Sequence, residues 1–410
     1  MFEKRKQLLC FSMFFILYEL TVYLSNDMIM PAMVQVVREF NASPRNIALS
    51  LSLFVLGGSL LQIFLGPLAD RIGKRKVMLA GNLLFLLATL AVPFTASIGQ
   101  FLTARFFQGM GCCFIFIGYA MIHELFDDHD AVKLTAILSN TTVFAPLIGP
   151  VVGSAIISVA DWRILCGVSL LLGSVALIGL YKFMPTGSVK PGQFHYGAIR
   201  RSYGKIFSNG TFMFGIVIAG MAITPLTAWI GLSPVIILDR MHASYSTYIL
   251  YQCLLFTGFI LSSMAIQRLG KDFSLTRLIR QGAALALIGM LAAGLGRDDG
   301  PFFILGMFVF SAGFGLFNGA LVRLSLNATG ESMSLTSSAM SLLYCIYISL
   351  GLEIYNLVCE HFNYTLASYA LFNVPLGVAI FFLLGRFVKR HEGQLVAAPA
   401  GSLPTAGQVN

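Results

Sequence analysis

Charged residues are scarce in this chain of 410 residues. Asp, Glu, Lys and Arg together make up 11% of it, whereas a soluble domain carries roughly 25%. Hydrophobic residues make up 57%. So few charges cannot cover the surface of a water-soluble protein of this size. The composition therefore excludes a soluble globular protein and predicts a helical membrane protein.

The sequence also lacks the patterns of metal, nucleotide and catalytic sites. Its seven cysteines show no C-x-x-C spacing, and its histidines form no metal or triad pattern. A Walker A motif is absent. The run Gly313–Gly319 resembles a dinucleotide fingerprint only superficially, because its spacing is wrong and small residues in a spanning helix serve packing. We expect no cofactor, no metal site and no enzymatic activity.

Twelve apolar stretches are long enough to cross a bilayer, since a spanning helix needs about 20 mostly apolar residues. They cover residues 8–31, 46–68, 77–96, 99–123, 133–158, 163–184, 211–238, 244–267, 276–296, 301–326, 334–358 and 364–387. These runs are too long and too uniformly apolar for barrel strands. The sequence predicts an all-α protein of twelve transmembrane helices.

The net charge of +9 is distributed very unevenly over this topology. One side carries Lys4, Arg5, Lys6, Arg71, Lys74, Arg75, Lys76, Lys190, Arg200, Arg201, Lys205, Arg268, Lys271, Arg277, Arg280, Arg386, Lys389 and Arg390. The other side has only Arg38, Arg45, Arg163, Arg240 and Arg297. The positive-inside rule therefore places both termini in the cytoplasm. Topology explains the basic character, so we expect no nucleic-acid partner.

One long polar connection divides the chain into two sets of six helices. The expected units are an N-terminal bundle (1–184), a cytoplasmic linker (185–208), a C-terminal bundle (209–390) and a disordered tail (391–410). The sequence Arg71–Lys74 after the second span is echoed by Arg268–Lys271 after the eighth. This echo indicates an internal duplication, hence two pseudo-symmetric bundles.

The first span carries two carboxylates, Glu19 and Asp27. Ionisable residues within a bilayer are costly and usually face a cavity where they function. Eight residues separate the two, about 12 Å along a helix and about 80° around it. Both can border one cavity, but they cannot form a tight pair that shares a proton. We expect this helix to bind protons or cations.

Arg105, in the fourth span, is a third charged residue at a position expected to lie within the membrane. It lies about six residues inside the predicted boundary, roughly 9 Å, and Asp27 lies at a compatible depth. An interaction between Arg105 and Asp27 is therefore expected, with snorkelling of the arginine as the alternative.

Glycines and prolines mark two further segments. In the loop after the second span, Gly66 would allow close helix approach, Asp70 would cap a helix or pair with an arginine, and Gly73 would permit a tight turn. The fifth span holds the run Ala145–Gly153. Proline and glycine in a spanning helix need a packing or hinge role.

These segments resemble the motifs of the major facilitator superfamily. The loop GPLADRIGKRK is similar to the family's signature between helices 2 and 3, and APLIGPVVG to the antiporter motif of helix 5, with Ser154 where the motif usually has glycine. Arg105-Phe106-Phe107-Gln108-Gly109 is similar to the R-x-x-Q-G motif of drug/proton antiporters. The first span resembles that branch as well.

The resemblance implies roles for particular residues. It implies proton coupling by Asp27, Glu19 and Arg105, and substrate binding by Glu19, Tyr23, Asn26, Asp27, Tyr119, Asn140 and Trp229. It implies gating by Gly66, Asp70, Arg71, Gly73, Lys74, Arg75, Pro146, Gly149, Pro150 and Gly153. Further candidates are Glu124, Arg323 and Glu353; the first two could instead snorkel, and Glu353 could pair with another helix or assist coupling. Which acid carries the coupling proton stays open.

The function expected from these features is proton-coupled efflux of small lipophilic cationic or neutral compounds by alternating access. The expected partners are these solutes, protons and the lipid bilayer. We expect a monomer in a bacterial cytoplasmic membrane. The alternatives are a dedicated transporter of one metabolite, siderophore or sugar on the same fold and, from another class, a membrane receptor or enzyme.

Overall fold

The computed structural model describes residues 2–126, 128–186, 196–268 and 274–396, and within them every regular element is a helix. The first half contains α1 (Phe2–Ile29), η1 (Met30–Ala32), α2 (Met33–Glu39), α3 (Arg45–Leu60), α4 (Gln62–Ile72), α5 (Lys74–Ala91), η2 (Val92–Phe94), α6 (Ile98–Gly109), η3 (Met110–Phe114), α7 (Ile115–Leu125), α8 (Asp128–Ile157) and α9 (Arg163–Phe183). The second half contains α10 (Tyr196–Ser208), α11 (Gly210–Ser233), η4 (Pro234–Arg240), α12 (Tyr245–Arg268), α13 (Leu275–Leu295), α14 (Gly300–Asn327), α15 (Met333–His361) and α16 (Leu366–Val396).

The expected spans match these helices or runs of helices. Ten are long and apolar enough to cross a membrane within the described residues, and α3 with α4, bent by 41°, makes an eleventh. The remaining expected span, 133–158, coincides with α8, which has 30 residues. Its described apolar part is Phe144–Ile157. The chain is a multi-pass membrane protein.

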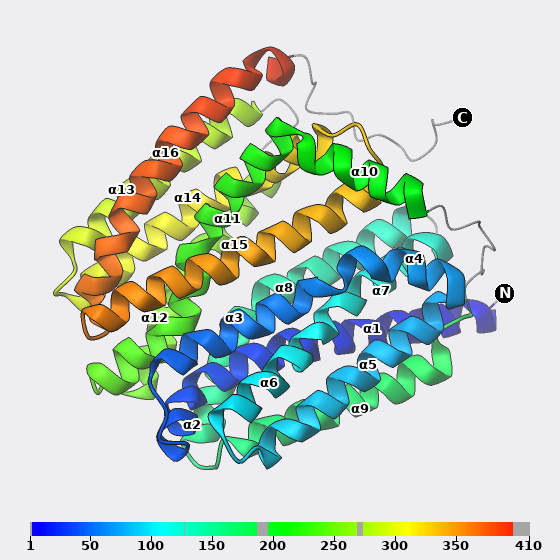
Figure 1. Ribbon diagram of the computed structural model, residues 1–410, viewed down its shortest axis with the longest axis horizontal. Coiled ribbons are helices and arrows are strands. Elements are labelled where there is room, and N and C mark those ends of the chain that lie inside the picture. Colours follow the sequence, from blue (N-terminus) through cyan, green and yellow to red (C-terminus); the bar gives the residue numbers. More distant parts are fainter. Residues whose placement is uncertain (1, 127, 187–195, 269–273, 397–410) are drawn as a thin grey trace.

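Long helices from both halves run side by side across the molecule in Figure 1. The short helix α2 lies at one end of this array; α10 and the start of α1 lie at the other. These ends are called the α2 end and the α10 end below. Helix α16 continues to Val396, six residues into the segment expected to be a disordered tail. Residues 397–410 lie outside the described part.

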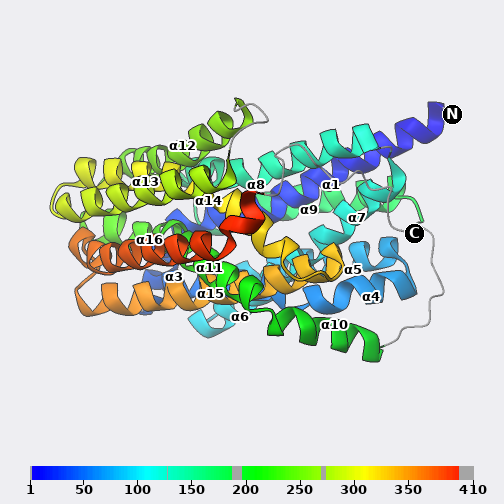
Figure 2. The ribbon, with the colours of Figure 1, turned by 90° about the horizontal axis from the view of Figure 1, so that it is seen from above.

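Helix α10 belongs to the predicted linker and does not span. It lies outside the long helices, beside α11 and α15 (Figure 2). Its apolar residues Tyr203 and Ile206 are buried against Phe212, Ile216 and Ala339, while its charged residues are exposed. An amphipathic helix that docks on one face in this way is a surface helix.

The halves are joined most tightly at the α2 end. There, Leu24–Val37 and the start of α3 share one continuous hydrophobic core with α11, α12 and α15. Towards the α10 end, the first half has a separate core of its own, built around Phe11, Phe15 and Phe85. The shared core indicates that the α2 end is closed in this structure.

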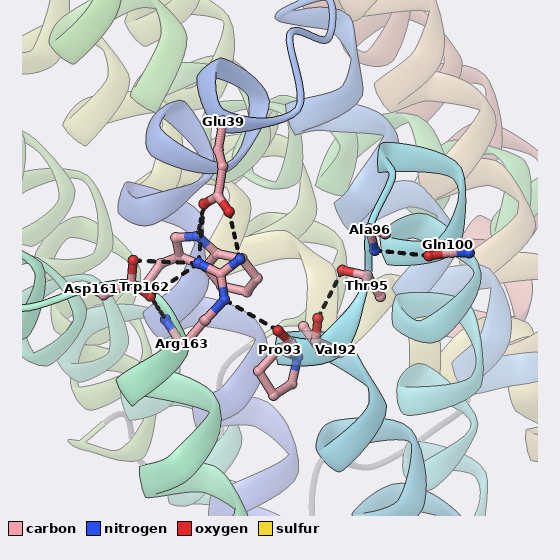
Figure 3. A network of polar contacts seen from close by, with 9 residues as sticks. All are labelled: Glu39, Val92, Pro93, Thr95, Ala96, Gln100, Asp161, Trp162 and Arg163. Atoms are coloured by element: carbon pink, nitrogen blue, oxygen red, sulfur yellow. Dashed lines mark hydrogen bonds and ion pairs between the residues drawn. The ribbon is translucent and has the colours of Figure 1, made fainter.

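The five arginines of the α2 end are all paired with carboxylates. The pairs are Arg38–Asp239, Arg45–Glu360, Arg163–Glu39, Arg240–Asp239 and Arg297–Asp298. Figure 3 shows Arg163 at the centre of one such cluster: it binds Glu39 of α2 and donates from Nε to the carbonyl oxygen of Pro93 at 3.2 Å. Trp162 Nε1 donates to the same carboxylate at 2.8 Å. This cluster fixes α2, and through it the adjoining end of α1.

Candidate functional site

Asp27 lies in the last turn of α1, directly before the 3-10 turn that contains Pro31. Its side chain is buried, with the residue 5% exposed. Helix α8 packs onto this turn through glycines. A Cβ atom added at Gly149 would collide with Asp27, and one added at Gly153 would collide with the carbonyl group of Met28. The absence of side chains at these positions lets α8 approach the backbone that carries the acid.

Arg105 of α6 is fully buried and lies close to this turn. Its Nη2 donates a hydrogen bond to Asn26 Oδ1 at 2.6 Å, and the Asn26 Nδ2 donates to Asp27 Oδ1 at 3.0 Å. An arginine can only donate hydrogen bonds, so the amide oxygen of Asn26 must face it and the amide nitrogen must face Asp27. The expected approach of Arg105 to Asp27 is therefore mediated by Asn26.

Further polar groups hold Arg105 in place. Nη1 donates to Gln108 Oε1 and Nε to Ser50 Oγ at 3.2 Å. The guanidinium carbon lies 4.6 Å from the ring centroid of Phe54, a cation–π distance. A buried charge needs such partners, because burial without them costs several kcal/mol.

The network extends from Gln108 to α5. Gln108 Nε2 donates to Thr89 Oγ1 at 3.0 Å, and Thr89 donates to the carbonyl oxygen of Phe85 at 2.7 Å. Thr89 and Ser50 were not predicted from the sequence as members of this site. A threonine or serine in an apolar helix usually bonds its own backbone, so neither residue stands out in the sequence.

Glu19 forms a second buried acidic position, between α1 and α7. Tyr119 donates a hydrogen bond from its hydroxyl to Glu19 Oε1 at 3.0 Å, and its ring packs edge-on against Phe15. Tyr23, one turn further along α1, is half-buried. Glu19, Tyr119 and Tyr23 are thus close in space. Asn140 lies on α8, and its side chain is outside the described part.

Trp229 lies apart from this group, in the interior of the second half. It is fully buried, with its ring 5.5 Å from that of Phe303 and 5.6 Å from that of Tyr369. Its indole ring is therefore part of an aromatic cluster inside the second half, and the structure does not bring it together with Glu19 and Tyr119.

The loop between α4 and α5 agrees only partly with expectation. Gly73 has a φ of 99°, a left-handed conformation that favours glycine, so the tight turn is present. Gly66 was expected to permit close helix approach, and this is wrong. A Cβ atom added there would meet nothing within 4 Å, because Gly66 points outward from α4. Asp70 and Arg71 are exposed, and no bond of Asp70 is seen to any described residue.

The basic residues of this loop contact neighbouring helices of the first half. Lys74 forms an ion pair with Glu124 at the end of α7. Arg75 donates to the carbonyl oxygen of Tyr181 on α9 and lies over its ring, 5.7 Å from the centroid. The loop is thereby tied to α7 and α9. Pro146 and Pro150 lie inside α8, which continues through both.

The remaining candidates differ in their surroundings. Arg323 is exposed on α14. Glu353 of α15 is half-buried and accepts a hydrogen bond from Ser52 Oγ of α3 at 2.8 Å. Glu353 therefore pairs with a helix of the other half.

Known proteins resemble this chain over almost its full length. It is 36% identical over 392 residues to the multidrug transporter MdfA of Yersinia pestis bv. Antiqua (strain Angola), covering 94% of this chain and 95% of that protein. It is 33% identical over 407 residues to the multidrug resistance protein MdtM of Salmonella typhimurium (strain LT2), covering 97% and 98%. The crystal structure of a D-xylose–proton symporter superposes with a TM-score of 0.71 at 16% identity, over 92% of this chain and 97% of that one.

The last of these similarities shows the fold alone. The family model of the Major Facilitator Superfamily matches residues 15–352. With that match, the helix arrangement and relatives above 30% identity over most of the chain, the protein belongs to the Major Facilitator Superfamily.

Proposed function

We propose that this chain exports small lipophilic compounds, cationic or neutral, in exchange for protons. The observation that carries the proposal is the buried chain of hydrogen bonds from Arg105 through Asn26 to Asp27. The names of the relatives, which describe multidrug transport and multidrug resistance, support the type of solute. The family and the named relatives are transporters, which supports a role as a transporter rather than an enzyme.

Asp27 is the proposed site of proton coupling. Burial favours the protonated form of a carboxyl group, whereas a hydrogen-bonded amide and a nearby arginine favour the anion. The two influences oppose each other at Asp27, so a small movement of α1 or α6 changes its proton affinity. Gly149 and Gly153 place α8 against the same turn, which links this change to the position of α8.

Glu19 is the proposed contact for the solute, with Tyr119, Tyr23, Asn26 and Asn140 around it. An apolar site discriminates poorly between lipophilic compounds, and a carboxylate adds a preference for cations. Glu19 can also take up a proton when a neutral compound is bound. Trp229 contributes indirectly, since it lies within the aromatic cluster of the second half.

The α10 end is the proposed cytoplasmic side, in a bacterial inner membrane. Most of the described Lys and Arg residues lie there, whereas the α2 end has Arg38, Arg45, Arg163, Arg240 and Arg297, and this excess of cations fits the positive-inside rule. Both termini are then cytoplasmic. The division into bundles 1–184 and 209–390 around the linker 185–208 follows the same proposal, with the protein acting as a monomer.

Alternating access requires that the two bundles separate at one end while they close at the other. The loop residues Lys74 and Arg75, held by α7 and α9, move with the first bundle. Asp70 and Arg71 are free to meet the second bundle when the α10 end closes. Pro146 and Pro150 allow α8 to adjust beside Asp27.

The proposal is tested by efflux from vesicles that contain the purified protein under an imposed pH gradient. A panel of lipophilic cations, neutral drugs and single sugars or metabolites is compared. We expect several unrelated lipophilic compounds to move and their transport to stop when the gradient is collapsed. Saturable movement of one metabolite only would instead indicate a dedicated transporter. Asp298→Asn, in an exposed loop, serves as the control substitution.

A further inference from the structure

Helix α15 carries a line of polar residues that faces the other half of the molecule. The line consists of Ser349, Glu353, Asn356 and Glu360. The spacings of four, three and four residues put all four on one face of the helix. Three of the four bond to groups of α3, and Glu360 approaches Arg45 to 4.0 Å. We call this line and its α3 partners the polar seam.

Ser52 is the central partner of the seam on α3. Its hydroxyl donates to Glu353 Oε1 at 2.8 Å, and its carbonyl oxygen accepts a hydrogen bond from Ser349 Oγ at 3.1 Å. Rotation of the Ser52 side chain would break its hydrogen bond to Glu353. Two bonds between the same pair of turns fix the register of α3 against α15.

Asn356 extends the seam towards the α2 end. Its Nδ2 donates to the carbonyl oxygen of Arg45 at 3.1 Å and lies 3.5 Å from Glu353 Oε2. Tyr364 donates to Asn356 Oδ1 at 3.1 Å, so the amide nitrogen must point towards α3 and Glu353. Both oxygens of Glu353 thus face donors.

The depth of Glu353 makes this arrangement more than a surface contact. It lies eight residues before the end of α15, about 12 Å along the helix. A carboxylate at such depth in a spanning helix is costly and calls for a role. The apolar core shared by both halves surrounds the seam, with Ala48, Leu51 and Leu352 among its members.

We propose that Glu353 is a positioning residue of the transport cycle, which holds the α2 ends of the two bundles together through Ser52. This inference rests on the proposed alternating access. For the α2 end to open, α3 must leave α15, and the bonds of the seam must then break together. Of the two acids in the seam, Glu353 lies deeper in the spanning helix, and Glu360 lies near its end. The acceptor oxygens of Glu353 therefore set how often that end opens.

The test measures the separation of the α2 ends directly. Nitroxide labels are placed at Ala96→Cys in the first half and Asp298→Cys in the second, both exposed at this end, after the seven native cysteines are replaced. Double electron–electron resonance then gives the populations of short and long distances. Glu353→Leu is expected to raise the long-distance population at least threefold. Glu353→Gln keeps one acceptor for Ser52 and should lie between Glu353→Leu and the unsubstituted chain.

Three further variants complete the test. Ser52→Ala removes the donor from the other half and should shift the populations in the same direction. The double substitution Ser52→Ala with Glu353→Leu should shift the populations no further than Glu353→Leu alone, because both substitutions remove the same bond between Ser52 and Glu353. Leu357→Ala, on an exposed part of α15, is the matched control and should change nothing. Each variant is first shown to be folded by gel filtration.

Unchanged populations in folded Glu353→Leu and Ser52→Ala would overturn the inference, as would fully additive shifts. The readout does not depend on which solute is carried. If the vesicle panel fails while these populations shift, the proposed drug efflux is wrong and the seam stands. If efflux is confirmed while the populations stay fixed, only the seam is refuted.

Discussion

At the scale of single residues, the orientation of one amide connects two charges. Asn26 accepts from Arg105 and donates to Asp27, and the donors of Arg105 dictate this orientation. The Asn26 amide therefore keeps its NH2 group directed at the Asp27 carboxylate for as long as Arg105 stays in place. Displacement of Arg105 frees the amide to rotate and removes a hydrogen bond that favours the anion.

Substitution of Asn26 should therefore uncouple the two charges. We expect Asn26→Leu to lower proton-driven efflux at least tenfold, because Asp27 loses its hydrogen bond and Arg105 a buried partner. Solute binding, measured by fluorescence or calorimetry without a gradient, should weaken as well, because Asn26 lies among the residues proposed around the solute, but by a smaller factor than efflux. A tenfold loss of rate corresponds to about 1.4 kcal/mol, close to the lower end of the roughly 1.5–3 kcal/mol of one hydrogen bond to a charged group.

Asn82 offers a matched control, since it is equally buried in a helix of the same bundle. Its amide has no hydrogen-bond partner within the described part of the chain. Asn82→Leu should leave efflux intact and not lower stability. If Asn26→Leu behaved like Asn82→Leu, the bridging role of Asn26 would be refuted.

The sequence predicted the buried charges of this region better than it predicted their contacts. Asp27, Glu19 and Arg105 are conspicuous because a charge in an apolar span is costly. Ser50 and Thr89 are inconspicuous, and their roles depend on the distance between helices. The bridging position of Asn26 between Arg105 and Asp27 could not be predicted. Position along a helix gives the depth of a residue in the membrane, but not which side chain lies between two charged groups.

At the scale of helices, the contact between α1 and α8 depends on two glycines. Gly153→Ala would drive a methyl group into the carbonyl of Met28, and overpacking of this kind costs typically 1–3 kcal/mol. We expect a lower melting temperature in detergent and reduced efflux, because the turn with Asp27 is displaced.

Gly167→Ala is the comparison for this substitution. Gly167 lies on α9, where an added Cβ meets nothing within 4 Å. Its melting temperature should be unchanged or slightly higher, since alanine favours helix. Equal effects of the two substitutions would contradict the proposed contact.

The docking of α10 provides a prediction for pH. Glu331, between two spans, is held by Ser202 and by Lys205, whose Nζ lies 3.0 Å from Glu331 Oε1. The hydrogen bond from Ser202, and then that from Lys205, lower the pKa of Glu331 below its ordinary value. A lowered pKa means that the contact stabilises docking above the pKa of free Glu, about 4.3. The stabilisation disappears as the pH falls through the lowered value.

We therefore expect α10 to stay docked from neutral pH to about pH 4 and to loosen below. The mobility of a nitroxide at Ser208→Cys measures this. Glu331→Gln should loosen α10 modestly at neutral pH and abolish the acid transition. A transition near neutral pH would show that another group controls docking.

Among the helices, the long apolar runs were predicted well, whereas the helix within the linker was not predicted. Each span is defined by the bilayer itself, because about 20 apolar residues have few alternatives. The linker was expected to be a polar, basic segment lying along the membrane surface, with no helix assigned to it, yet Ile199, Tyr203 and Ile206 recur at helical spacing. The polar line on α15 was equally readable, with Ser349, Glu353 and Asn356 on one face. Its meaning became clear only when α3 was found opposite.

At the scale of the whole molecule, the two halves meet through different chemistry at their two ends. At the α2 end they share a core, a salt bridge of 2.5 Å between Arg38 and Asp239, and the polar seam. Towards the α10 end the first half has its own core. On α1, Asp27 lies next to this shared core, and Glu19 lies about two turns nearer the α10 end.

The central claim is that solute leaves in exchange for a proton carried at Asp27. The most direct measurement follows protons with a pH-sensitive dye inside vesicles that contain the protein while a transported lipophilic cation is added. We predict that solute addition to the unsubstituted chain drives proton movement in the direction opposite to the solute. Asp27→Asn should abolish this movement while Asp298→Asn retains it. Full proton movement in folded Asp27→Asn would contradict the account.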